Sequence, residues 1–365
     1  MNNSEKKRVI YQISNNSINN TILIYKVMDN GNLNYFGFKL TGGCGSSLNH
    51  TNSLFSQNPI IVFKKFLFAV NSGSNSFSLF KINSKDPTDI QLLKIIDSCG
   101  DYPVSIAVNK RIVAILNGGE KSNLVGFKWN KSGKIEIKPS FIRDILLNPQ
   151  QTTPPKGLYN TVSDILFSSD NKCIIISYKG TSKSNPGGLL IYTVKKDKVS
   201  EKPIYNILQG GCLSFGMKKS GKNGLIITNA SNGVYFIVYD SSTGQTNSFY
   251  PDFLPINGAV CWIAHSKKTK HYYIISTITS QITEIKINKK NSLEIINTYL
   301  LPEDSLPSDA NIAKIGNLEL LFVNSPGTKS INVILIKSSG IIMKIHNVKY
   351  PTNYSSKKII GMAIK

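Results

Sequence analysis

A strand-like run of apolar residues occurs seven times along this chain of 365 residues. Every copy is rich in Val, Ile, Leu and aromatic residues and ends in Asn, Ser, Gly or Thr, the composition of a strand that leads into a turn. The copies lie about 50 residues apart, a period typical of four-stranded propeller blades and longer than that of common helical repeats. They are residues 9–14, 67–72, 112–118, 173–180, 225–231, 272–279 and 320–325.

The segments around each copy complete a four-stranded unit. A second apolar run, a polar turn and a more polar strand follow, and a short apolar segment precedes six of the seven copies. The segment missing before residues 9–14 occurs instead at 359–364. We therefore predict an all-β fold, a seven-bladed β-propeller that forms a single domain over residues 1–365. Its C-terminal strand pairs with the N-terminal blade, because a closed ring leaves no open sheet edge. A two-sheet sandwich, the alternative, does not predict seven units.

The chain is strongly basic, with 43 Lys and Arg against 21 Asp and Glu and a formal charge of +22. Forty of these cations are Lys, and the three Arg are Arg8, Arg111 and Arg143. Proteins that read nucleic acids rely more on Arg, whose planar fork binds phosphates and bases bidentately. The Lys-rich, Asn-rich composition is typical of an AT-rich genome, such as that of a protist or of a large DNA virus that infects one. Binding of polyanions or nucleic acid through the Lys-rich surface remains an alternative.

Other sequence features concern location and cofactors. Residues 1–8 lack the apolar stretch of a signal peptide, so we expect a cytoplasmic protein, or alternatively a virion protein. No run approaches the roughly 18 apolar residues of a membrane span. The five cysteines are widely spaced and form no CxxC motif, so we expect free thiols, no metal site and no cofactor. They are Cys44, Cys99, Cys173, Cys212 and Cys261.

One segment resembles a known family. Residues 67–80, LFAVNSGSNSFSLF, are similar to the LFAVNxGSNxxSxF segment of the lactonase-type seven-bladed propellers, which include proteins described as 3-carboxymuconate cyclase-like and 6-phosphogluconolactonase-like. Further similar pieces follow in the family's order, at residues 102–108, 116–119, 163–168 and 261–263. The resemblance implies a propeller whose central channel carries His, Glu and Arg side chains at its mouth, acting on a lactone. The family's His typically follows a Pro where an innermost strand begins.

The chain departs from that pattern. None of the seven places where an innermost strand is expected to begin contains His, and all three Arg lie elsewhere. His265 ends an innermost strand, at the opposite rim. We therefore predict a non-catalytic interaction or structural propeller whose partner is another protein or an anionic surface. The alternative is a lactonase or cycloisomerase for a sugar or muconate lactone, using relocated groups such as Asp164 or Asp309 with a Lys.

Polar and aromatic residues near the start of the innermost strands define a predicted channel-mouth pocket. Asp residues there could bind a cation or polarise a hydroxyl, but Asp also commonly caps turns. A Trp there could stack on a ligand, but packing between adjacent blades is the more common role of a Trp in a strand. The predicted pocket consists of Asp101, Tyr102, Ser163, Asp164, Phe215, Trp262 and Asp309.

Overall fold

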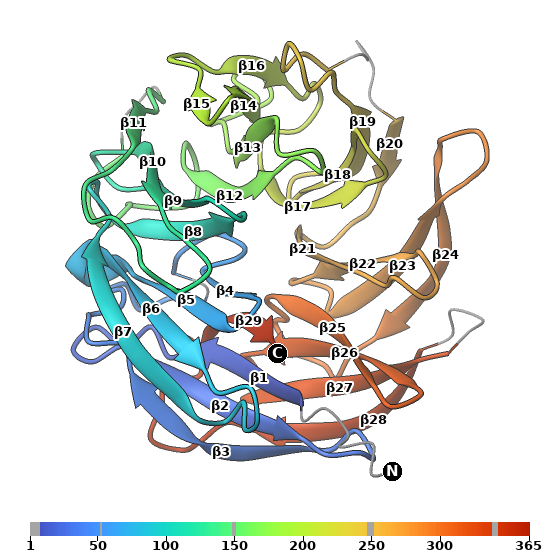
Figure 1. Ribbon diagram of the computed structural model, residues 1–365. Helices are drawn as coiled ribbons and strands as arrows, with labels where there is room; N and C mark the ends of the chain where they lie inside the picture. Colours follow the sequence, from blue (N-terminus) through green and yellow to red (C-terminus); the bar gives the residue numbers. More distant parts are fainter. Residues whose placement is uncertain (1–7, 52, 148–150, 247–251, 338–341) are drawn as a thin grey trace, which may run out of the picture.

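A computed structural model describes residues 8–51, 53–147, 151–246, 252–337 and 342–365 of the chain. Within these residues, seven antiparallel sheets are arranged around a central axis, as Figure 1 shows. Their innermost strands contact one another in the order β29, β4, β8, β12, β17, β21 and β25, and β25 contacts β29 again. This confirms the predicted all-β, seven-bladed propeller.

In each blade the strands follow one another in space from the innermost, at the channel, to the outermost. Blade 1 is β29 (Ile360–Ile364), β1 (Arg8–Ile13), β2 (Thr21–Val27) and β3 (Leu33–Leu40); blade 2 is β4 (Ile60–Phe63), β5 (Phe66–Asn71), β6 (Ser76–Ile82) and β7 (Ile90–Asp97). Blade 3 is β8 (Pro103–Val108), β9 (Ile112–Asn117), β10 (Asn123–Lys128) and β11 (Phe141–Asp144). Blade 4 is β12 (Val162–Phe167), β13 (Cys173–Tyr178) and β14 (Gly188–Lys195), and β14 pairs with both β15 (Lys198–Val199) and β16 (Ile204–Ile207).

The remaining blades follow the same order. Blade 5 is β17 (Ser214–Ser220), β18 (Gly224–Asn229), β19 (Gly233–Val238) and β20 (Asp252–Pro255). Blade 6 is β21 (Val260–His265), β22 (Tyr272–Ser276), β23 (Gln281–Ile287) and β24 (Leu293–Leu300). Blade 7 is β25 (Ala310–Ile315), β26 (Leu318–Ser325), β27 (Ser330–Ile336) and β28 (Ile342–Lys349), and a 3₁₀ turn, η1 (Ser72–Ser74), joins β5 to β6.

The burial of each strand follows its place in the blade. Every residue of the second strands β5, β9, β13 and β18 is buried, because neighbouring blades cover both faces of the sheet. Such strands have continuous apolar sequences, which is why the repeat is visible without alternation. The outermost strand β3 is mostly exposed. The core therefore lies between the blades, and the outermost strands lie at the outer edge of the disc.

The ring closes where the sequence predicts. β29 pairs antiparallel with β1, with Ile10 opposite Ile364 and Ile13 opposite Ile360. The backbone of Lys365 also donates to the carbonyl of Val9 at 3.0 Å. The C-terminal strand therefore supplies the innermost position of the N-terminal blade, as predicted. In the described ranges, no helix has the length and apolar character that a membrane crossing requires.

Several innermost strands contain a bulge near the place where they begin. The register shifts between Pro103 and Ser105 in β8, between Val162 and Asp164 in β12, and between Val260 and Trp262 in β21. A bulge leaves one residue unpaired and re-aims the neighbouring side chains. The bulges lie at Ser163 and next to Trp262, so they decide where these two predicted site residues point.

Candidate functional site

The central channel has two rims, and the chain itself closes one of them. We call the rim where the innermost strands begin the start rim, and the rim where they end the end rim. Residues 53–58, which precede β4, cross the start rim and are called the plug. Ser53, Leu54, Ser56 and Gln57 of the plug are all buried. The place where the sequence predicts a channel mouth is therefore occupied by the protein's own chain.

Hydrogen bonds tie the plug to blades 3 and 4. The backbone N–H of Gln57 donates to the Ser163 carbonyl at 3.1 Å. The Ser56 hydroxyl donates to the Val104 carbonyl at 2.7 Å, and the Ser105 hydroxyl donates to the Gln57 carbonyl at 2.6 Å. Since buried backbone groups need such partners, these bonds make the plug a part of the folded core instead of a loop over it.

The Gln57 side chain extends the plug to the opposite side of the channel. Its Nε2 donates to the Ile263 carbonyl at 3.1 Å, and its Oε1 accepts from the Ile263 amide at 3.3 Å. A Cβ at Gly216 would lie 2.0 Å from this Oε1, so only glycine leaves room for the Gln57 amide. The plug thus bridges blades 3 and 4 to blade 6 past a glycine of blade 5.

A buried lysine lies directly under the plug. Lys179 follows β13 and is fully buried, and its Nζ donates to the Phe55 carbonyl of the plug at 2.8 Å. The same Nζ lies 2.5 Å from Ser163 Oγ and 3.1 Å from Thr161 Oγ1, and 4.6 Å from the centre of the Phe215 ring. Among the described residues, Lys179 forms no ion pair. Lys179 is not among the residues predicted from the sequence. The signal that could have pointed to it is its position directly after β13, a strand in which every residue is buried.

The protons around Lys179 can be assigned. Ser163 Oγ donates to the Ser214 carbonyl at 2.9 Å, and Thr161 Oγ1 donates to the Leu158 carbonyl at 2.7 Å. Each hydroxyl has one proton, so both must accept from the amine, as does the Phe55 carbonyl. The Val162 carbonyl, 3.4 Å from Nζ, is a fourth and more distant acceptor, so all three N–H groups of an ammonium have partners. Burial disfavours the charged ammonium and lowers the pKa of Lys179 to about 7, although the nearby Cys261 has the opposite effect.

A Ser hydroxyl beside a lysine of lowered pKa is a pair that could, in an open site, supply a nucleophile and its base. Here Ser163 and Lys179 are both fully buried beneath the plug, and the Ser163 proton is directed to a backbone carbonyl. Through the bond of Lys179 to the Phe55 carbonyl, the pair links blade 4 to the plug.

Of the predicted pocket residues, Ser163, Asp164, Phe215 and Trp262 are brought together. Phe215 and Trp262 are both buried and pack edge to face with ring centres 5.2 Å apart. Trp262 Nε1 donates to the Ser56 carbonyl of the plug at 3.4 Å. Trp262 thus packs between blades, which is the second of the two roles considered for it.

The two buried carboxylates have different surroundings. Asp164 accepts from Asn58 Nδ2 at 2.7 Å and from the backbone amides of Ile165 and Met217 at 2.8 and 3.0 Å. Burial raises its pKa to about 6, although Lys218 and these bonds oppose the rise. Asp309 is also buried, and burial raises its pKa to about 7 against the opposing effect of Lys218. Both carboxylates therefore face the same lysine from different blades.

The remaining predicted residues lie at turns on the start rim. Asp101 is half-buried and caps a turn by accepting from the Lys121 amide at 3.1 Å. Tyr102 is buried, and its hydroxyl donates to the Ser53 carbonyl at 3.0 Å and contacts Ser46 Oγ at 2.5 Å. Asp101 therefore stabilises a turn of the start rim, and Tyr102 supports the plug. The described residues contain no group of three or more His, Cys, Asp or Glu side chains that could hold a metal ion.

The end rim is open. A cavity of about 790 Å³ lies among the ends of the innermost strands of blades 1, 2, 5, 6 and 7. Asn58, the last residue of the plug, is one of its lining residues, so the plug closes the channel on the far side. The cavity is lined by the cations Arg8, Lys218, Lys267, Lys268 and Lys314 together with His265 and Glu319. We call it the end-rim cavity.

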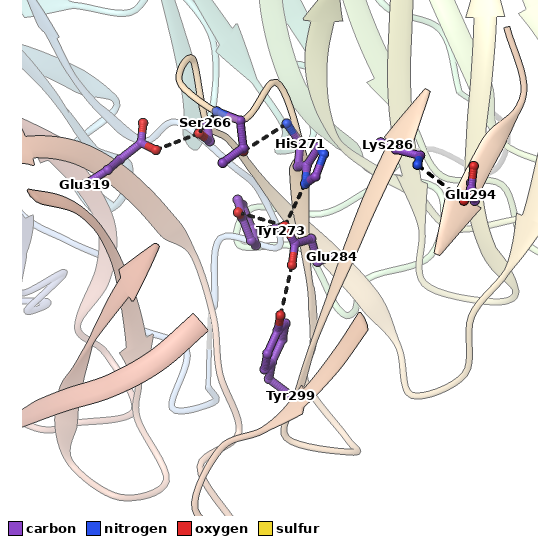
Figure 2. A network of polar contacts seen from close by, with 9 residues as sticks. Ser266, His271, Tyr273, Glu284, Lys286, Glu294, Tyr299 and Glu319 are labelled. Atoms are coloured by element: carbon purple, nitrogen blue, oxygen red, sulfur yellow. Dashed lines mark hydrogen bonds and ion pairs between the residues drawn. The ribbon is translucent and has the colours of Figure 1, made fainter. Parts of the chain in front are cut away.

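A second polar network lies within blade 6, away from the channel. The buried Glu284 carboxylate contacts His271 Nδ1 at 2.7 Å and accepts from the hydroxyls of Tyr273 and Tyr299 at 3.1 and 3.0 Å, as Figure 2 shows. Ser266 donates to Glu319 at 2.7 Å beside it. Because every contact to Glu284 comes from the same blade, we interpret this network as holding β22, β23 and β24 together.

Comparisons with known proteins bear on the fold. The chain has no match among protein-family models or among curated protein sequences. It superposes on a Bacteroides fragilis protein that is inferred to be a 6-phosphogluconolactonase. The TM-score of this superposition is 0.74 and the sequence identity is 13%, and it covers 100% of this chain and 99% of that one. For a similarly assigned Bacteroides uniformis protein the TM-score is 0.73, with 14% identity and coverage of 99% and 100%. For the periplasmic gluconolactonase of Pseudomonas aeruginosa it is 0.71, with 11% identity and coverage of 98% of both chains.

This is the lactonase-type propeller fold. The superpositions cover essentially the whole chain, as the resemblance of residues 67–80 and the later pieces implied. At such low identity the likeness extends to the fold and not to the chemistry. Within this lactonase-type propeller, the plug and Lys179 occupy the start rim, where the resemblance places a lactone site.

Proposed function

We propose that this protein is a non-catalytic interaction propeller on a lactonase-type scaffold. The plug is the observation that supports this most directly. Residues 53–58 fill the rim at which the resemblance places the lactone chemistry, and Ser53, Leu54, Ser56 and Gln57 are buried there. A lactone has to reach a general acid or base within hydrogen-bonding distance, and the plug occupies that space.

The side chains beneath the plug support the same proposal. Asp164 accepts hydrogen bonds from Asn58, Ile165 and Met217, so its oxygens are occupied by protein donors. Ser163 and Lys179 bond each other and the plug. Groups committed in this way rigidify a core and are not free to exchange protons with a ligand.

The partner we propose is another protein or an anionic surface. The formal charge of +22 attracts anionic partners and accelerates their encounter at low salt. The five cysteines, all of them free thiols, suit a reducing compartment. We accordingly place the protein in the cytoplasm, with packaging in a virion as the alternative that its AT-rich type of composition suggests.

The experiment is a lactonase assay. Purified protein is incubated with a panel of sugar and muconate lactones, and ring opening is followed against spontaneous hydrolysis. The Pseudomonas aeruginosa gluconolactonase serves as the positive control on a gluconolactone. We expect no rate above background. Any turnover above background would overturn the proposal. Its loss in Asp164→Asn or Asp309→Asn would then establish the alternative, a lactonase with relocated groups, and unchanged turnover in both variants would exclude that assignment of groups.

A further inference from the structure

The end-rim cavity combines a large volume with an excess of positive charge. Its volume of about 790 Å³ is within the range of sites for small organic molecules. Five cations line it against one carboxylate, that of Glu319. Glu319 is itself buried and accepts from the Ser266 hydroxyl at 2.7 Å, so this carboxylate is engaged by the protein.

The cations come from several blades and converge on one space. Arg8 begins β1, Lys218 lies on β17 and Lys314 lies on β25, while Lys267 and Lys268 follow β21. Among the described residues, none of the five forms an ion pair. The Arg8 side chain is fixed, because its Nε donates to the Lys314 carbonyl at 3.1 Å. Its terminal nitrogens remain available for a bidentate contact with an anion.

His265 reports the electrostatic potential inside this space. It stacks on Tyr272 with ring centres 4.3 Å apart and lines the cavity. Burial, together with the nearby charges of Lys218 and Lys267, lowers its pKa to about 4. Deeper in the channel, Asp164 and Asp309 face Lys218 and offset part of its charge, which leaves the other four cations at the rim. The field in the cavity is therefore positive.

The shape of the cavity selects among anions. Asn58 of the plug lies at its closed side, and Ile60, Val62, Ile312 and Met362 supply apolar walls. A cavity of this volume, closed on its inner side by the plug, matches the size of a compact organic molecule. We propose that the end-rim cavity binds a small organic polyphosphate, with Arg8 and the lysines holding its phosphates and the apolar walls contacting its organic part.

This inference goes beyond the proposed function and adds a small-molecule site to it. The test is isothermal titration calorimetry of the full chain with ATP and, separately, with inorganic tripolyphosphate. The cavity variant is Arg8→Met with Lys218→Met. The matched control is Lys289→Met with Lys290→Met, which removes the same charge from an exposed turn of blade 6 outside the cavity.

We expect ATP to bind the wild type with a Kd below 1 mM at 150 mM salt. The cavity variant should weaken binding at least tenfold, and the control should change it less than twofold. Tripolyphosphate should bind more weakly than ATP, because it lacks the part that contacts the apolar walls. In NMR spectra the His265 imidazole should titrate at higher pH when ATP is bound, since the anion offsets the cations beside it.

Three results would overturn the inference: no ATP binding below 1 mM, an equal loss of affinity in both variants, or an unchanged His265 titration on saturation. An equal loss would indicate diffuse polyanion binding by the lysine surface, and long duplex DNA would then bind both variants alike. The lactonase assay separates the two proposals. Turnover together with ATP bound in the cavity would overturn the non-catalytic function and leave this site standing.

Discussion

Replacing Lys179 by Met should reveal the cost of keeping an amine beneath the plug. Met keeps the length of the side chain and removes the charge, but it leaves the Phe55 carbonyl and the hydroxyls of Thr161 and Ser163 without a donor. Each unsatisfied group costs about 1–3 kcal/mol. The variant also avoids the desolvation penalty of the buried ammonium, and this gain in stability is of similar size. A comparison at one pH therefore decides little, and the pH dependence is the informative quantity.

The expected dependence follows from the pKa values of the two states. The native pKa of Lys179 is lowered to about 7, from 10.5 for an unperturbed lysine. Between these values the unfolded chain binds more protons than the folded one, so the stability of the wild type rises with pH across this window. The destabilisation that comes from burying protonated Lys179 has its full size below pH 7 and decreases as the pH rises toward 10.5. From pH 7 to pH 9 the wild type should gain about 2 kcal/mol relative to Lys179→Met.

The assay is urea unfolding followed by the fluorescence of Trp129 and Trp262 at pH 7, 8 and 9. The quantity compared is the difference in unfolding free energy between wild type and variant, in which the other titrating groups cancel. Lys183→Met, at an exposed loop position, is the control and should give a difference that does not change with pH. A flat difference for Lys179→Met would refute the reasoning. It would mean that the three acceptors and the Phe215 ring keep this lysine charged throughout.

Three further substitutions test other parts of the molecule by the same unfolding assay. Asp309→Asn should stabilise the protein by about 2–4 kcal/mol at pH 7.5, and this gain should vanish near pH 4. The reason is that the raised pKa of this carboxyl makes its ionisation in the folded protein unfavourable, a cost that builds up only as the pH rises toward 7. A gain that is constant with pH would contradict this. Gly216→Ala should cost about 1–3 kcal/mol through its clash with Gln57 Oε1, and Gln57→Ala in the same chain should restore part of the loss; strictly additive effects would show that the two do not meet. Glu284→Ala should cost about 3–5 kcal/mol, since it strips a buried network of its acceptor, whereas Lys286→Ala, which breaks the exposed pair with Glu294 seen in Figure 2, should cost about 0–1 kcal/mol; equal costs would contradict the assigned roles.

The location of the positive cavity could not be predicted from the amino-acid composition. The charge of +22 is a property of the whole sequence, and lysines occur on turns of every kind. Arg8 and Lys314 are separated by about 300 residues, yet the closure of the ring places both at the end rim. A charge count predicts attraction to anions, but only the ring decides where the cations converge.

The sequence by itself determined the number of blades and the closure of the ring by residues 359–364, because these depend on local apolar runs and turn residues. It also predicted four strands in each blade, which holds except in blade 4, where β14 pairs with both β15 and β16. It also drew attention to Ser163, Asp164 and Trp262, which contact residues 53–58 or their bonding partners. The tertiary structure decided what fills the start rim. Ser53 and Gln57 have the composition of a solvent-exposed loop, and Lys179 is one lysine among 40. Their burial follows from hydrogen bonds between residues more than 100 positions apart, such as that of Lys179 with Phe55, and such long-range partners leave no mark on local periodicity.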